Sequence, residues 1–123
     1  MIKAEDLRIG DLVRYGKDII TILATHADGL VCFADGKDQI CVEHVLLEPI
    51  PLTPEILEKN GWERDKLVTY IYGHKAHFIE VICTPNSEWV YVTFKGETIH
   101  RIKYVHELQH ILWALGLDAN LKI

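Results

Sequence analysis

The sequence predicts a mixed α+β protein, with an N-terminal SH3-like small β-barrel followed by a helix, an antiparallel four-stranded meander and a C-terminal helix. Three observations predict this class. Residues 1–50 hold short strand-like runs between tight turns, residues 53–61 carry helix start and stop signals, and residues 104–115 carry an apolar stripe at helical spacing. The chain has 123 residues, and we expect a barrel subdomain over 1–50 and an α+β subdomain over 51–123.

The first fifty residues have the pattern of short strands joined by hairpins. Gly16-Lys17-Asp18 is a turn, and Asp28-Gly29 and Asp35-Gly36 are hairpin signals. The expected strands cover residues 12–15, 19–25, 30–33 and 39–45. Short strands with tight turns favour a small barrel over a flat sheet, because closure removes exposed edges.

The second half begins with a helix and returns to strands. Thr53 is expected to cap that helix with Pro54 at its first position, and Asn60-Gly61 to end it. A second helix is expected over residues 104–115, closed by Gly116. Between the helices, the four expected strands of the meander cover residues 67–72, 78–84, 89–94 and 98–102.

Composition narrows the class of protein. The net charge is −5 and no basic stripe is visible, which disfavours nucleic acid as a partner. The sequence has neither a membrane-spanning apolar run nor a signal peptide pattern, so we expect a cytoplasmic protein without a membrane partner.

Three cysteines, Cys32, Cys41 and Cys83, lie in strand-like runs without a C-x-x-C pair, and we interpret them as small buried apolar residues.

The last helix contains a match to the HExxH zinc-protease motif, His106-Glu107-Leu108-Gln109-His110. Histidines at i and i+4 can hold zinc on one helix face, and Glu107 can act as general base on a metal-bound water. A third ligand would have to come from upstream, where His100 and His77 are the candidates. A helical wheel places His106 and His110 opposite the core stripe, on a face expected to meet solvent, which weighs against a walled catalytic cleft.

Trp113 shares that expected outward face with the two histidines. An exposed tryptophan of this kind is typical of a contact surface for a partner or for a second copy. The alternative is that the N-terminal barrel packs over this face. The hypothesis is therefore an interaction surface that includes Trp113, His106 and His110.

A second candidate surface lies on the strand of residues 89–94. Alternation places Val90, Val92 and Phe94 in the core and directs Trp89, Tyr91 and Thr93 to the other face. Tyr70 and Tyr72 are candidates to extend that face from a neighbouring strand. Such a face can stack on bases, with Lys95 as a nearby cation, but we favour packing on the barrel or cross-strand aromatic pairs as its explanation.

Three segments resemble a known family. They are residues 7–13 (LRIGDLV), residues 49–57 (PIPLTPEIL) with Gly61-Trp62, and residues 103–109 (KYVHELQ). In this order they resemble a family of small uncharacterised proteins of Bacteroides-type gut bacteria and their phages or prophages. The resemblance implies a phage-related accessory protein in the bacterial cytoplasm. It also implies that the HExxH-like match arose by chance, since the family often has an amide residue at the position of His110.

The leading functional hypothesis is a non-enzymatic binding or protein-interaction module. Its expected partner is another protein or a second copy of the chain, and no cofactor is expected. Trp89 and Tyr91 join Trp113 as candidate interaction residues. Two alternatives stay open: a minimal zinc-dependent hydrolase built on the motif of the last helix, and a nucleic-acid accessory protein that uses the aromatic strand.

Overall fold

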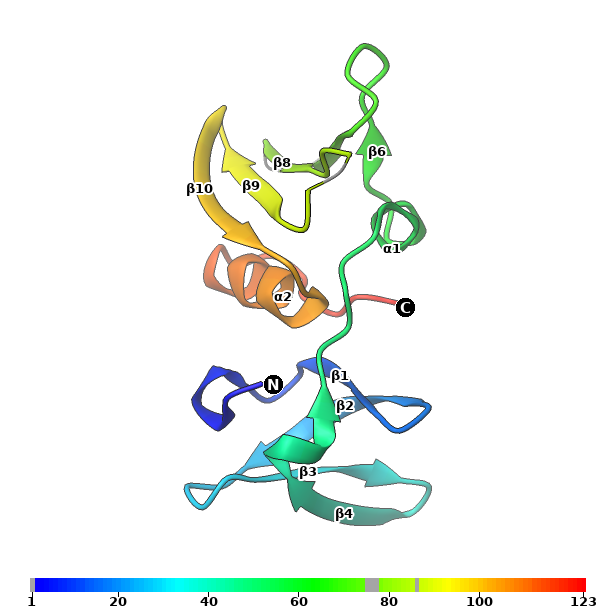
Figure 1. Cartoon of the computed structure of the whole chain (residues 1–123), viewed down its shortest axis with the longest axis vertical. Coiled ribbons are helices and arrows are strands. Elements are labelled where there is room, and N and C mark those ends of the chain that lie inside the picture. Colours follow the sequence, from blue (N-terminus) through cyan, green and yellow to red (C-terminus); the bar gives the residue numbers. More distant parts are fainter. Residues whose placement is uncertain (1, 75–77, 86) are drawn as a thin grey trace. The chain divides into compact units, whose positions relative to one another are not determined.

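The computed structural model describes residues 2–74, 78–85 and 87–123. Over these residues the protein is mixed α+β, with two antiparallel sheets and two α-helices (Figure 1). The chain divides into two compact units. The first comprises Met1–Ile50 with Tyr104–Asn120, and the second comprises Pro51–Lys103 with Leu121–Ile123.

The first unit is built on a sheet that curls into a half-barrel. Its elements are η1 (Ala4–Asp6), β1 (Leu12–Tyr15), β2 (Asp18–Thr25), β3 (Leu30–Asp35), β4 (Asp38–Glu43), η2 (His44–Leu46) and β5 (Leu47–Glu48). Within the described chain the sheet has five strands in the order β4-β3-β2-β1-β5. The four strands expected in residues 12–45 are therefore present, and β5 is an additional short strand.

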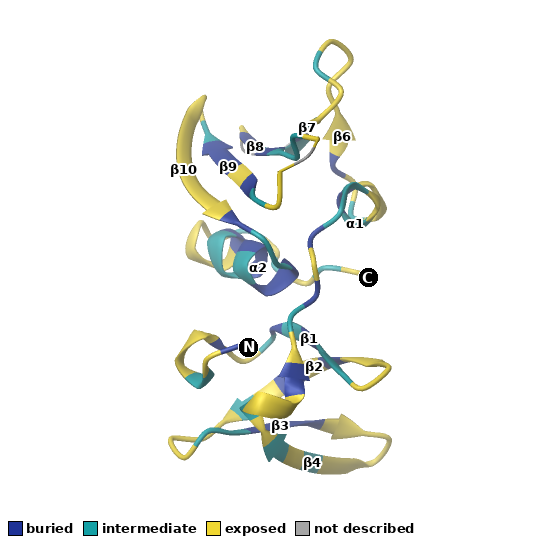
Figure 2. Ribbon diagram, in the orientation of Figure 1, coloured by how far each residue is buried: buried dark blue, intermediate teal, exposed yellow. Residues whose placement is uncertain are grey.

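The core of the first unit follows from the alternation of side chains along its strands. Val13 and Ile22 are fully buried, and their neighbours along the strand are more exposed. Figure 2 shows the same alternation as changes of colour along the ribbons. The buried apolar cluster consists of Ile2, Leu7, Val13, Ile20, Ile22, Val31, Phe33 and Leu47. These residues fix the face of the sheet that is covered, and hence its register.

The second unit begins with α1 (Pro54–Lys59), which has the expected signals. The Oγ1 atom of Thr53 accepts a hydrogen bond from the Ile56 N–H at 3.4 Å, and Pro54 occupies the first turn. Gly61, with φ of +84°, follows the end of the helix. The side chain of Asn60 also pairs with the backbone of Lys122, donating to its carbonyl and accepting from its N–H at 2.7 Å each.

The sheet of the second unit is an antiparallel meander, as expected, but the number and the bounds of its strands differ from the expectation. Its strands are β6 (Glu63–Arg64), β7 (Ile71–His74), β8 (Ile79–Ile82), β9 (Val90–Phe94) and β10 (Glu97–Ile102). Among described residues it thus has five strands rather than four, in the order β10-β9-β8-β7-β6. The strand expected from Leu67 begins only at Ile71. The reason is local: the carboxylate of Asp65 accepts hydrogen bonds from the N–H groups of Leu67 and Val68 at 2.8 and 2.9 Å, which holds a turn there.

The last helix, α2, spans Val105–Ala114 and confirms the helix expected over 104–115. The Glu107 carboxylate accepts a hydrogen bond from the Tyr104 N–H at 3.1 Å, and Gly116 follows the helix with φ of +74°. The sequence placed this helix with residues 51–103, whereas its contacts group it with the first fifty residues. In the part of the chain that the structure describes, neither helix has the length and apolar character needed to cross a membrane.

Candidate binding site beside the last helix

The face of α2 that was expected to meet solvent is largely covered. His106 is 5% exposed and Gln109 is 3% exposed, whereas Trp113 is 69% exposed. The expectation of an outward His106 is therefore wrong. For Gln109 and His110 the reason is that residues 10–12 supply partners for their polar groups, as the alternative packing supposed. His106 is covered in a different way, by neighbouring rings that pack against it. The periodicity of apolar residues shows which face of a helix is buried in the core. It does not show that a polar side chain is also buried when it has hydrogen-bond partners inside the protein.

Gln109 is the clearest such case. Its Oε1 atom accepts from the Leu12 N–H at 2.9 Å, and its Nε2 group donates to the carbonyls of Gly10 and Ala119 at 3.0 Å each. One buried amide thus satisfies three backbone groups from two separate segments. This arrangement fixes α2 against the start of β1 and against the residues after the helix.

The second link between α2 and the first turn is an acid–histidine pair. The Nε2 atom of His110 lies 2.9 and 2.8 Å from the two carboxylate oxygens of Asp11. Asp11 is 2% exposed, and its carboxylate also accepts from the Arg8 N–H at 2.8 Å. The carboxylate is held in place because Arg8 to Asp11 form a tight turn, in which Gly10 has φ of +96°.

His106 lies beside this pair but belongs to a different environment. Its ring stacks on that of Tyr104 with centroids 5.9 Å apart, and its edge meets the ring of His110 at 5.7 Å. Its Nδ1 atom is buried without a hydrogen-bond partner. Burial lowers the pKa of His106 below its ordinary value of 6.5, and the negative charges of Asp11 and Glu107 only partly oppose that shift. His106 is therefore a neutral, buried side chain at neutral pH.

These positions do not favour the zinc-hydrolase hypothesis. The Nε2 atom of His110 is engaged by Asp11, and the carboxylate of Glu107 caps the helix at Tyr104. His100 lies on β10 in the second unit, and His77 is outside the described residues. Across the described ranges, the single group of three or more metal-ligating side chains is His26, Cys32 and Cys41, which excludes both motif histidines.

A pocket of about 570 Å³ opens beside α2 within the first unit. It is lined by residues 7–11, by Thr25, by Gln109, His110 and Trp113, and by Ala119 and Asn120. Its volume lies in the range of ligand-binding pockets. Two lining residues, Ile9 and Trp113, are large apolar side chains that are 70% and 69% exposed. The guanidinium carbon of Arg8 lies 6.0 Å from the centroid of the Trp113 ring.

The pocket therefore combines a fixed floor with an exposed rim. Buried Asp11 and partly buried His110 are bonded to each other and form the floor of the pocket, and Gln109 anchors the adjoining backbone. Arg8, Ile9 and Trp113 present one cation and two apolar surfaces to solvent. Among the described lining residues Thr25 supplies the one hydroxyl group and no thiol is present.

The aromatic strand of the second unit is arranged differently from the expectation. Tyr91 is exposed, but Thr93 is 5% exposed and Tyr72 is 2% exposed, so neither belongs to an outward aromatic face. The hydroxyl of Tyr72 instead accepts from the Nε group of Arg64 at 3.1 Å. The ring of Trp89 carries two cations, since Arg101 and Lys103 lie 4.5 and 4.3 Å from its centroid. These contacts compete with base stacking on Trp89.

Sequence reasoning missed the residues that build the pocket, apart from Trp113 and His110. In the sequence, Asp11, Arg8 and Ile9 stand out only as part of residues 7–13, one of the three segments that carry the family resemblance. The local signal was limited to turn-forming residue types at Gly10 and Asp11. What that signal does not reveal is the partner of the carboxylate, His110, which is 99 residues away.

Comparison with known proteins gives no family assignment. No protein-family model, no curated protein and no solved structure matches this chain. The resemblance carried by residues 7–13, 49–57 and 103–109 therefore stays a prediction. The function of the protein has to be argued from the geometry of the site.

Proposed function

We propose that this protein is a non-enzymatic binding module whose first unit binds a peptide segment of a partner protein in the pocket beside α2. The observation that carries the proposal is the exposed rim, where Ile9 and Trp113, about seven-tenths exposed, both line a pocket of about 570 Å³. We further propose an SH3-like class for the curled sheet. The phage or prophage context in the bacterial cytoplasm, implied by the resemblance, belongs to the same proposal.

The chemistry of the rim supports a protein partner. Tryptophan and arginine are the residues most enriched among those that dominate binding energy at protein interfaces. Here Arg8 and Trp113 lie together, and the apolar side chain of Ile9 adjoins the same pocket. Removal of an apolar side chain of this size from water contributes about 2 kcal/mol. Such a rim is costly to leave in water and is covered when a peptide docks.

The floor of the pocket supports binding because it is already ordered. The Asp11 carboxylate is satisfied by two partners, and Gln109 holds three backbone groups. A binding surface that is fixed before the ligand arrives loses less conformational freedom on association. The same bonds occupy the ring nitrogen of His110 that a hydrolytic metal site would need. The geometry therefore favours recognition over catalysis.

The test is selection of peptides from a random display library on the purified protein. Selected peptides should bind the wild type and lose roughly 30-fold in affinity with Trp113→Ala, the loss expected for a hot-spot residue. Tyr91→Ala is the matched control, because it removes an exposed aromatic from the second unit. Failure of any peptide to enrich, or equal binding by Trp113→Ala, contradicts the proposal.

Sedimentation of the free protein separates the two kinds of protein partner. If a second copy is the occupant, wild-type protein sediments as a dimer and Trp113→Ala as a monomer. We expect a monomer in both cases, because the proposal assigns the pocket to a different protein. A dimer abolished by Trp113→Ala would overturn that assignment of the partner.

A further inference from the structure

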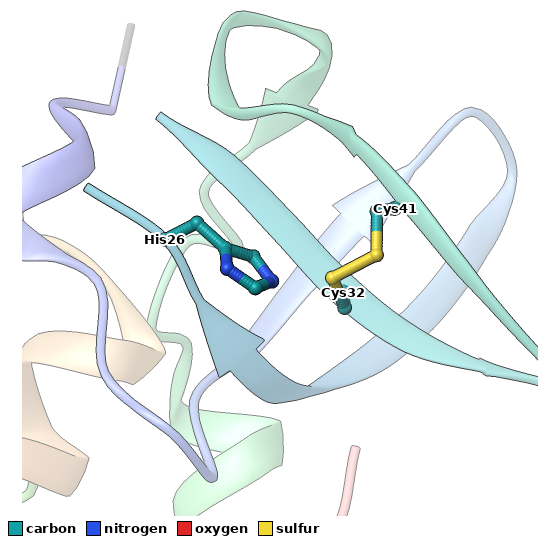
Figure 3. Close-up of side chains that lie close together, drawn as sticks. All are labelled: His26, Cys32 and Cys41. Carbon is teal, nitrogen blue, oxygen red and sulfur yellow. A yellow bond between two sulfur atoms is a disulfide. The ribbon is translucent and has the colours of Figure 1, made fainter. Parts of the chain in front are cut away.

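A cluster of three metal-ligating side chains is formed by Cys32, Cys41 and His26 of the first unit (Figure 3). Cys32 on β3 and Cys41 on β4 are direct neighbours in the antiparallel register, with Cα atoms 4.0 Å apart, and are joined as a disulfide. The ring of His26 points toward the sulfur atoms, as Figure 3 shows. The interpretation of the cysteines as small buried apolar residues is wrong for Cys41, which is exposed, whereas Cys32 is buried as expected but is joined to Cys41 in the disulfide.

The backbone of the strands holds the three residues in place. The β3–β4 hairpin pairs Phe33 with Ile40 and Val31 with Val42 on either side of the two cysteines. His26 follows β2, and its N–H donates to the Leu30 carbonyl at 2.9 Å, which begins the turn into β3. All three side chains thus project from paired backbone or from the residue next to it. The cluster does not depend on a long loop for its geometry.

Two thiolates and an imidazole are a ligand set that zinc prefers. Ligand atoms on a tetrahedral zinc ion lie roughly 3.3–3.8 Å from one another, given metal–ligand bonds of about 2.0–2.3 Å. The ligand atoms here all lie within 4.8 Å of one another. Cys32 is buried, whereas Cys41 and His26 are exposed, so three protein ligands would leave the fourth position of a bound ion toward solvent.

We propose that Cys32, Cys41 and His26 form a redox-gated zinc site, which is closed as a disulfide in the oxidised protein and binds one Zn²⁺ ion when both cysteines are reduced. The two states exclude each other, because a disulfide leaves no thiolate for the metal. Reduction of the sulfur–sulfur bond takes two electrons and two protons. An external dithiol supplies both as it closes to its own disulfide. Binding of Zn²⁺ then releases one proton from each thiol.

The redox conditions of the cellular compartment determine whether the disulfide or the zinc-bound form is the more populated state. Disulfides are rare in reducing compartments, where dithiol systems keep cysteines as thiols. In such a compartment the site is open to zinc. An external disulfide that reoxidises the pair by thiol–disulfide exchange takes up the two electrons as it is reduced to thiols, and the Zn²⁺ ion is released. Since the pair joins β3 to β4 directly, either state cross-links the same hairpin. The switch between disulfide and zinc site therefore changes which groups are exposed at the surface, while the pairing of β3 with β4 is retained.

The test is zinc titration of the full chain in both redox states, with a chromophoric chelator as competitor. Protein reduced by a dithiol that is then removed should bind one Zn²⁺ per chain, and oxidised protein should bind none. Substitution of Co²⁺ for Zn²⁺ should give the charge-transfer absorption of cobalt–thiolate bonds in the reduced protein alone. No stoichiometric binding after reduction, or equal binding by the oxidised protein, overturns the proposal.

Single substitutions locate the ion. Cys41→Ser and His26→Gln alter exposed side chains and should each weaken zinc binding at least ~100-fold, the upper end of losses caused by groups that merely support metal ligands. Cys83→Ser and His100→Gln are the matched controls, since they remove a cysteine and an exposed histidine of the second unit. Zinc affinity unchanged in Cys41→Ser or His26→Gln, or lost in the controls, places the ion elsewhere and contradicts the assignment.

Discussion

His110 and Asp11 are 99 residues apart in sequence, yet the His110 Nε2 atom lies within 2.9 Å of both carboxylate oxygens of Asp11. This pair, together with the Gln109 amide, joins the C-terminal helix to the turn that precedes β1. The proposed binding pocket lies at this junction, so its stability and its shape depend on the same few polar contacts.

Asp11→Ala should destabilise the first unit strongly. The substitution leaves the Arg8 N–H and the His110 ring without their acceptor in a buried setting, and loss of hydrogen bonds to a charged group costs about 2–3 kcal/mol. Urea denaturation measures the change in the free energy of unfolding. Asp38→Ala, which removes an exposed carboxylate on β4, is the control. Equal stability of the two variants would contradict this role for Asp11.

Gln109→Leu should be destabilising although it preserves volume. A leucine fits the space, but the Leu12 N–H and the carbonyls of Gly10 and Ala119 lose their partner, and each buried unsatisfied group costs about 1–3 kcal/mol. Thermal and urea unfolding should both show the loss, whereas Gln39→Leu on exposed β4 should be close to neutral. A Gln109→Leu protein as stable as wild type would mean that water or neighbouring groups replace the amide.

His106 should make the protein less stable as the pH falls. Its pKa in the folded protein is below the ordinary 6.5 of the unfolded chain, mainly because burial disfavours the charged ring. Above that ordinary value both states are neutral and the stability is complete. As the pH falls below it, the unfolded chain takes up a proton that the folded protein does not, so the free energy of unfolding decreases until the folded pKa is passed.

The measurement is the free energy of unfolding at a series of pH values from neutral into the acid range. His106→Leu should show a smaller decline than wild type, and His100→Gln on exposed β10 should keep the wild-type decline. A His106→Leu profile parallel to that of the wild type would show that His106 is protonated equally in both states.

Cys83 should react slowly with thiol reagents while the protein is folded. Burial raises the pKa of its thiol from 9.0 to about 11, so at pH 8 the reactive thiolate is roughly 100-fold scarcer than for an ordinary cysteine. The rate of modification by a disulfide reagent can be followed in a Cys32→Ser, Cys41→Ser background, where Cys83 is the one remaining thiol. Modification of folded and urea-unfolded protein at the same rate would rule out this protection.

Most of the elements could be predicted because their signals are local. The cap at Thr53, the hairpin at Asp35-Gly36 and the helix end at Gly116 each depend on residues within a few positions. The disulfide was also within reach, since Cys32 and Cys41 are each three residues from the paired ends of that hairpin, Asp35 and Asp38. The pair was missed because each cysteine was assigned to its own strand, and the register between the two strands was not considered.

The pocket could not be predicted in the same way. Its floor depends on contacts between residues 8–12 and the helix of residues 105–114, and a single sequence carries no record of which distant segments meet. The helical wheel also assumed that a polar face is a solvated face. For Gln109 and His106 that assumption failed, because buried partners or stacked rings replaced water.

The most direct test of the central claim is chemical-shift mapping of the ¹⁵N-labelled protein with the tightest selected peptide. We expect the amide signals of residues 8–12 and 109–113 to shift in a saturable way, together with the indole N–H of Trp113, and the amide shifts to saturate only at a roughly 30-fold higher peptide concentration in Trp113→Ala. Shifts confined to the strand of Trp89 and Tyr91, or shifts that saturate at the wild-type peptide concentration in Trp113→Ala, would contradict a binding site beside the last helix.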